Sequence, residues 1–157
     1  MGRRTKAREC AVQMLYQWEI GRASIGEVMT DYWSVRSTVD ATRALAERMV
    51  RGVCQHQEAI DLVVTEACTN WRFDRLATID KCVLRLGSYE LMMEPGTPVA
   101  VVIDEAIELA RRFGEADSPA FVNGVLDAVR RKVRGEKKGQ PHAQPASKGA
   151  GSKNERE

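Results

Sequence analysis

The chain has 157 residues, of which 43% are hydrophobic and 29% charged, and its net charge at pH 7 is only +2. This length favours one domain with a hydrophobic core of its own. No apolar run is long enough for a membrane helix, and the charged N-terminus lacks the apolar stretch of a signal peptide, so we expect a cytoplasmic protein.

The first predicted helix covers residues 5–20, where Ala11, Met14, Leu15 and Trp18 recur at helical spacing. Its beginning is basic, although positive charge at a helix N-terminus opposes the helix dipole. A bound polyanion would offset this unfavourable interaction between the basic side chains and the helix dipole. The alternative is that these are solvated charges on a frayed terminus. The basic residues are Arg3, Arg4, Lys6 and Arg8.

Two more helices are predicted before residue 70. Residues 25–35 form a short helix with apolar positions on one face. Residues 40–69 keep helical spacing without a proline, so we predict one long helix that only Gly52 interrupts. The polar insert Gln55, His56 and Gln57 is interpreted as a solvated turn.

Residues 70–77 are predicted to be a loop with aromatic content that ends in a short helical segment. Residues 79–93 then form the most apolar helix of the chain, which we expect at the centre of a bundle. Gly87 and Ser88 within it are small enough for a neighbouring helix to come close.

The next helix is predicted from Thr97, whose hydroxyl can cap a helix, and Pro98, which suits the first helical position. Gly114 is expected to end this helix in a left-handed conformation.

A short polar corner then leads into the last helix. Asp117 and Ser118 before Pro119 repeat the start signal, and apolar residues follow at helical spacing. Asn123 and Gly124 lie inside this helix, where a glycine costs roughly 1 kcal/mol relative to alanine. We therefore expect a close approach at Gly124, either by a neighbouring helix or by a ligand.

No segment alternates with a period of two for long enough to be a strand, so the predicted fold class is all-α. Residues 135–157 lack large apolar side chains and are rich in Gly, Pro, Ser, Lys and Ala. Such a segment cannot offset its ordering entropy by burial. We predict a helical domain over residues 1–134 and a disordered basic tail over residues 135–157.

The cysteines favour neither a disulfide nor a metal site. They lie far apart without a C-x-x-C pair, and each falls among apolar neighbours of a predicted helix, so we expect buried free thiols and no metal. These residues are Cys10, Cys54, Cys68 and Cys82.

No nucleotide-binding or hydrolase motif is present in the sequence, and we predict neither an enzyme nor a bound cofactor. Asp104 and Glu108 form the one carboxylate pair whose spacing could serve acid–base catalysis. The simpler interpretation is that Glu108 forms ion pairs with Arg111 and Arg112 on the helix surface.

Nucleic-acid binding is better supported. The four basic residues at the start can neutralise phosphates, and Tyr16, Phe113 and Phe121 can stack on bases if they are exposed. The alternative for Phe121 is a place in the core. Four contacts with single-stranded phosphates would lower the affinity roughly 50-fold between 50 and 200 mM salt.

Three blocks of the sequence, in this order, resemble the NusB family of transcription antitermination factors. They read ARECAVQMLYQWEI, KCVLRLGSYEL and VVIDEAIELARRFG followed by DSPAFVNGVLD. The resemblance covers residues 3–133. It implies a compact bundle of about seven helices in two packed subdomains, without catalytic activity.

The family resemblance also implies partners. Such proteins bind the boxA sequence of nascent RNA together with NusE, a ribosomal small-subunit protein, in the antitermination complex of RNA polymerase during ribosomal RNA transcription. Carried over by position, the RNA-binding residues are Arg3, Arg4, Lys6, Arg8, Phe113, Asp117, Ser118, Phe121 and Asn123. The residues for NusE are Tyr16, Asp74 and Asp80, although Tyr16 could equally serve RNA.

Three alternatives stay open at this point. The chain could be a helical protein-interaction adaptor with only non-specific RNA affinity. Some relatives of the fold are dimers, and a homodimer could cover the basic surface. The tail lies outside the family pattern, so it could add RNA affinity or have no effect.

Overall fold

A computed structural model describes residues 2–135 of the chain, and the predicted tail lies outside them except for Gly135. Seven α-helices, one 3-10 turn and no strand within residues 2–135 confirm the all-α prediction. The helices are α1 (Arg3–Ile20), α2 (Ile25–Val35), α3 (Asp40–Gln55), α4 (Gln57–Ala67), α5 (Thr78–Met93), α6 (Val99–Phe113) and α7 (Ser118–Arg134), with η1 (Phe73–Arg75) before α5.

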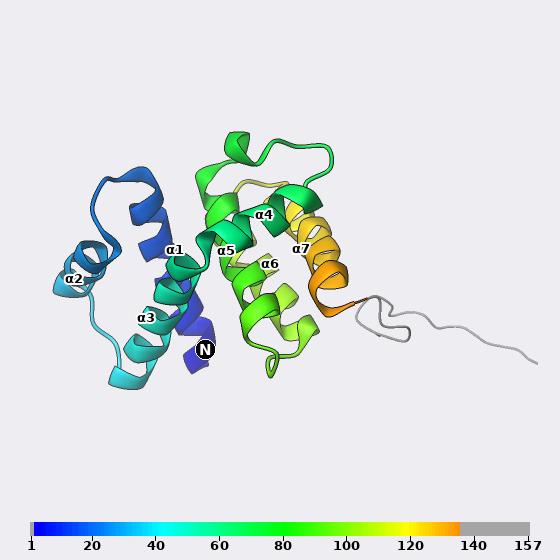
Figure 1. Cartoon of the computed structure of the whole chain (residues 1–157). Coiled ribbons are helices and arrows are strands. Elements are labelled where there is room, and N and C mark those ends of the chain that lie inside the picture. Colours follow the sequence, from blue (N-terminus) through cyan, green and yellow to red (C-terminus); the bar gives the residue numbers. More distant parts are fainter. Residues whose placement is uncertain (1, 136–157) are drawn as a thin grey trace, which may run out of the picture.

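The helices form two packed groups. Helices α1, α2 and α3 pack together on one side, and α4 to α7 pack together on the other (Figure 1). Helix α5 contacts α1, α3, α4, α6 and α7, so it joins the two groups. This arrangement confirms the two packed subdomains and the central place predicted for residues 79–93.

Two glycines allow the close packing around α5. A Cβ atom at Gly87 would lie 2.8 Å from Cδ1 of Leu126, so this glycine lets α7 approach as expected. A Cβ atom at Gly52 would lie only 2.4 Å from the ring of Tyr89. Both positions are buried, and neither leaves room for alanine without movement of a neighbour.

The prediction of one helix over residues 40–69 is wrong. Helix α3 ends at Gln55 and α4 begins at Gln57, because His56 has φ −109° and ψ 22° and leaves the helical conformation. Gly52 stays within α3, where the ring of Tyr89 occupies the space that a side chain would need. The break therefore falls in the polar insert and not at the glycine.

The boundaries of α6 also differ from the prediction. Pro98, and not Thr97, occupies the N-cap position, and no side chain caps this end. Gly114 has φ −102° and ψ −165°, which is extended and not left-handed. Glycine is required there by space, because a Cβ atom would lie 2.6 Å from Oγ of Ser118.

An interior ion pair fastens α1 to α5. Arg8 is 2% exposed and donates hydrogen bonds of 2.8 Å from Nε and Nη2 to the two carboxylate oxygens of Glu90. Glu105 of α6 lies 3.5 Å from the same guanidinium. The expectation that Arg8 binds RNA phosphate is corrected here, because its guanidinium is enclosed and fully engaged.

Helical spacing explains this position of Arg8. It lies three residues before Ala11 and seven before Leu15, both buried, so it belongs to the apolar face of α1. Arg3, Arg4 and Lys6 lie on the exposed part of the same helix.

We predict that Arg8→Ala lowers the free energy of unfolding by about 3–5 kcal/mol, because it leaves Glu90 buried without its partner. Urea unfolding at pH 7 measures this change. Arg3→Ala, at an exposed position of the same helix, serves as the control and should change stability by less than about 0.5 kcal/mol. Equal stability of the two variants would contradict the structural role of Arg8.

Candidate nucleic-acid interface

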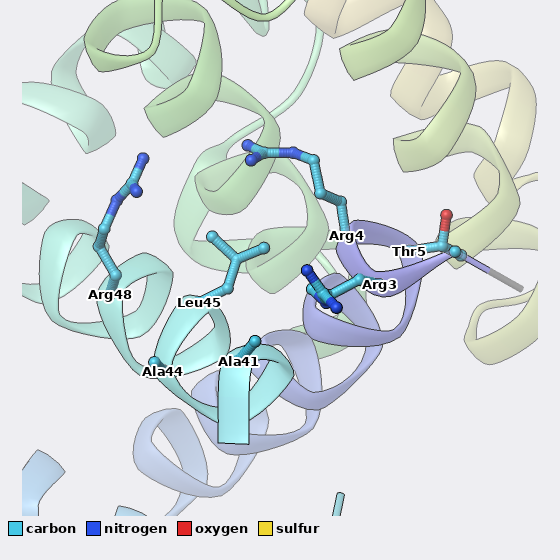
Figure 2. A pocket seen from close by; sticks show the side chains of 8 residues that line it. Arg3, Arg4, Thr5, Ala41, Ala44, Leu45 and Arg48 are labelled. Atoms are coloured by element: carbon cyan, nitrogen blue, oxygen red, sulfur yellow. The ribbon is translucent and has the colours of Figure 1, made fainter. Parts of the chain in front are cut away.

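A basic pocket lies between the start of α1 and α3, and we call it the α1–α3 pocket. Its volume is about 790 Å³. Figure 2 shows Arg4 and Arg48 extending from the two helices on either side of Leu45. The pocket is lined by Gly2, Arg3, Arg4, Thr5, Ala41, Ala44, Leu45 and Arg48.

The start of α1 is suited to an anion. Gly2 occupies the N-cap position without a side-chain cap, and the first turn contains no acidic residue. Its free amide groups and the positive end of the helix dipole therefore act together with the basic side chains. Arg3, Arg4 and Lys6 are exposed, and none of the three forms an ion pair within residues 2–135.

Glu94 holds the third arginine of the pocket. Nη2 of Arg48 lies 2.7 Å from each carboxylate oxygen of Glu94, and the hydroxyl of Tyr89 donates to the same carboxylate at 3.1 Å. Burial alone would raise the pKa of Glu94, but these hydrogen bonds and the charges of Arg48 and Arg4 lower it. Glu94 is therefore ionised at neutral pH and pairs with a cation of the pocket.

A second concave region brings together Tyr16 and Phe113, two of the predicted site residues, and we call it the α1–α6 groove. Its volume is about 510 Å³. Tyr16 is 39% exposed, and Phe113 is half-buried with the guanidinium of Arg112 5.5 Å from its ring centre. Gln13, Gln17, Arg36, Ala77, Thr78, Ile79 and Glu115 complete the lining.

Ser118 does not face solvent. It is 1% exposed, and its Oγ accepts a 3.0 Å hydrogen bond from the backbone N–H of Glu115. Helix α7 begins at Ser118 itself, with Asp117 at the N-cap position. The expectation that Ser118 contacts RNA is corrected, because its hydroxyl fixes the corner between α6 and α7. Asp117 remains exposed beside it.

The two acidic residues predicted to bind a partner differ in their surroundings. Asp80 is half-buried near Ser118, and its Oδ1 has no hydrogen-bond partner within residues 2–135. Burial raises the pKa of Asp80, the hydrogen bond with Ser118 lowers it, and the negative charges of Asp117 and Glu115 raise it further. Asp74 is exposed and lies 3.1 Å from Arg72.

Phe121 packs against an exposed tryptophan that the sequence analysis did not single out. The ring centres of Trp71 and Phe121 lie 5.6 Å apart at an interplanar angle of 75°. Trp71 is 61% exposed, whereas Phe121 is half-buried. Phe121 therefore lies at the edge of the core and supports a larger aromatic surface from the loop before η1.

Asn123 and Gly124 lie on the outer face of α7, and both are exposed. No atom would lie within 4 Å of a Cβ atom at Gly124. The alternative that a neighbouring helix approaches this glycine is therefore wrong, and the alternative of a ligand stays untested. Asn123 is two residues after Phe121, about 200° around the helix, so the two side chains flank opposite sides of α7.

The predicted site residues thus fall into separate regions of the molecule. Tyr16 follows Arg3 by thirteen positions of α1, which corresponds to about 20 Å along the helix. A single bound nucleotide cannot contact both, whereas an extended strand can.

The acidic pair Asp104 and Glu108 is exposed on α6. Glu108 accepts a hydrogen bond from Arg111, as the surface interpretation predicts. Arg112 instead pairs with Glu9 of α1, so it joins two helices.

The four cysteines are free, as predicted, and all but the half-buried Cys54 are buried. Burial raises the pKa of Cys54 to about 11 and that of Cys82 to about 12, so neither is a thiolate at neutral pH. Within residues 2–135, no cluster of His, Cys, Asp or Glu has the arrangement of a metal site, and no helix could span a membrane.

Most of the chain is similar to known proteins. The family model described as NusB family matches residues 5–131. A transcription antitermination protein NusB of Sorangium cellulosum is 46% identical over 129 residues, which cover 82% of this chain and 92% of that protein.

Solved structures share the fold. NusB of T. maritima superposes with a TM-score of 0.76 at 32% identity, over 84% of this chain and 92% of that one. A chain from a complex of the antitermination factors NusB and NusE with dsRNA superposes with a TM-score of 0.77 at 26% identity. The superposition covers 84% of this chain and 98% of that one.

We predict that Gly124→Ala raises the free energy of unfolding by about 0.5–1 kcal/mol, because alanine favours an exposed helix position and meets no neighbour there. Gly87→Ala is the contrasting variant and should lower stability, since its Cβ would overlap Leu126. Urea unfolding of both variants measures whether the free energy of unfolding rises in the first and falls in the second. Destabilisation by Gly124→Ala would mean that the helix requires glycine at this position.

Proposed function

The chain belongs to the NusB family, and on that premise we propose that this non-catalytic antitermination factor binds the boxA sequence of nascent ribosomal RNA together with NusE. The family match and the relatives named above support antitermination. A structural neighbour in complex with NusE and RNA supports the choice of partners. The observation that carries RNA binding is the uncapped basic start of α1.

The phosphate contacts come from Arg3, Arg4 and Lys6. Because Arg8 is buried, three contacts replace the four expected from the sequence. With a slope of about −0.7 per contact for a single strand, the affinity falls roughly 20-fold between 50 and 200 mM salt. A roughly 20-fold loss of affinity would indicate three phosphate contacts, whereas a roughly 50-fold loss would indicate four.

The remaining RNA contacts lie beyond the basic end. Phe113 and Phe121 offer aromatic edges, Asn123 an amide that can hydrogen-bond a base, and Asp117 an exposed acceptor. Ser118 and Arg8 support this surface from inside and do not touch the RNA.

NusE binds near the other end of α1. Tyr16 is exposed there, and Asp74 and Asp80 provide negative charge that suits a basic ribosomal protein. Tyr16 also lines the α1–α6 groove beside Phe113. This position lets Tyr16 contact either NusE or the RNA. Joint binding of both partners follows from such an arrangement.

Fluorescence anisotropy of a labelled boxA RNA, with and without NusE, tests this function. We expect tighter binding to boxA than to a scrambled RNA of equal length, and a further gain when NusE is present. Equal affinity for both RNAs under both conditions would support the alternative, a protein-interaction adaptor with non-specific RNA affinity.

Replacing Arg3 and Arg4 together with alanine should reduce the salt slope of RNA binding by about 1.4, because two phosphate contacts are lost. The double variant Arg22→Ala with Arg75→Ala is a charge-matched control, since both arginines are exposed and form no ion pair within residues 2–135. A titration series from 50 to 200 mM salt measures the slopes. Identical slopes for the two double variants would remove the start of α1 from the interface.

Asp74→Asn should weaken NusE binding about threefold, chiefly through slower association, because it removes an exposed charge at the edge of the interface. Stopped-flow or surface-binding kinetics with NusE alone provide the measurement. Asp104→Asn, also exposed but on α6, is the control and should leave the association rate unchanged. A loss of boxA affinity without a change in NusE binding would reassign Asp74 to RNA.

A further inference from the structure

We propose that the α1–α3 pocket is a subsite for one nucleotide of the bound RNA, in which α3 receives the base and α1 receives its phosphate. This inference rests on the proposed function and adds α3 to the interface. The sequence analysis placed no RNA contact on that helix.

Apart from Arg48, the residues of α3 that line the pocket are apolar. Ala41 and Ala44 are exposed but too small to fill the space beside α1, and Leu45 is half-buried and packs against the core. A base has an apolar face that can lie on such a wall and a polar edge that stays in water. The volume of about 790 Å³ lies within the usual range of ligand sites and accommodates a nucleotide.

The opposite wall recognises negative charge. Arg3 and Arg4 extend from the first turn of α1, where the free amide groups of an uncapped helix also point outward. Both side chains are exposed. A guanidinium plane can hydrogen-bond a phosphate and also stack on a base, so arginine suits both parts of a nucleotide.

Arg48 contributes a third guanidinium, which is already held by a carboxylate. Its side chain is 56% exposed, yet it donates hydrogen bonds to both carboxylate oxygens of Glu94, which lies outside the pocket lining. A phosphate that enters the pocket competes with Glu94 for Arg48. The negative charge of Glu94 therefore limits the affinity of the pocket for an anion.

The lining favours a nucleotide over other anions. It contains three arginines and no carboxylate, which selects an anionic ligand. Inorganic phosphate alone would leave the apolar wall of α3 uncovered. An acidic peptide is the remaining alternative, and the experiment below distinguishes it from RNA.

Ala44→Leu fills the pocket without removing a charge, and Ala59→Leu on the exposed face of α4 is the matched control. We expect Ala44→Leu to weaken binding of boxA RNA at least about fivefold at every salt concentration, because one base loses its place. The salt slope should stay that of the unchanged protein. Both variants should unfold at the same urea concentration as the unchanged protein, since leucine suits an exposed helix position.

Glu94→Gln should act in the opposite direction. It removes one negative charge near the pocket while the amide oxygen can still accept from Tyr89, so we expect RNA affinity to rise about threefold in 50 mM salt. Glu58→Gln, at an exposed position of α4, controls for the general loss of one negative charge. The gain should disappear when Glu94→Gln is combined with Arg48→Ala.

Equal RNA affinity of the Ala44→Leu variant, the Ala59→Leu variant and the unchanged protein would overturn the subsite. Impaired binding of a poly-glutamate peptide together with unchanged RNA binding by Ala44→Leu would also overturn it, in favour of an acidic protein ligand. Failure of the proposed function looks different, because the unchanged protein would then show no preference for boxA over scrambled RNA.

Discussion

The enclosed ion pair between Arg8 and Glu90 is the contact on which the rest of the molecule depends. It holds α1 against α5, and α1 supplies one wall of both concave regions. On the same helix α5, Arg85 donates to Asp61 of α4 and to Glu19 near the end of α1. Two arginines thus attach α1 to the central helix at two points, and the positions of its exposed residues follow from these attachments.

Local patterns were sufficient to predict the helices, because apolar periodicity is a property of neighbouring residues. The segments over residues 25–35 and 79–93 were close to α2 and α5, and the capping box of Ser24 and Glu27 fixes the start of α2. Helix ends were less predictable. The break falls at His56, and Gly114 is extended because the side chain of Ser118, four residues on, occupies the space beside it.

The candidate site was predictable only in part, because residue type does not determine which way a side chain points. Arg3 and Arg8 are both basic and belong to one helix, but only Arg3 lies on its polar face. A helical wheel of α1 would have placed Arg8 with Ala11 and Leu15. The wall formed by Ala41 and Ala44 had no local signal, since it becomes a binding surface only beside α1, about forty positions away.

The position of α1 has a consequence for biosynthesis. Helix α1 precedes its partners along the chain, since Glu90 follows Arg8 by 82 positions and Arg112 follows Glu9 by 103. Contacts so distant along the chain form late, because loop closure precedes the gain from burial. During translation, the ion pairs of α1 with α5 and α6 therefore cannot form until these two helices have been made. A nascent chain that ends before Glu90 lacks the enclosed ion pair that holds α1 against α5.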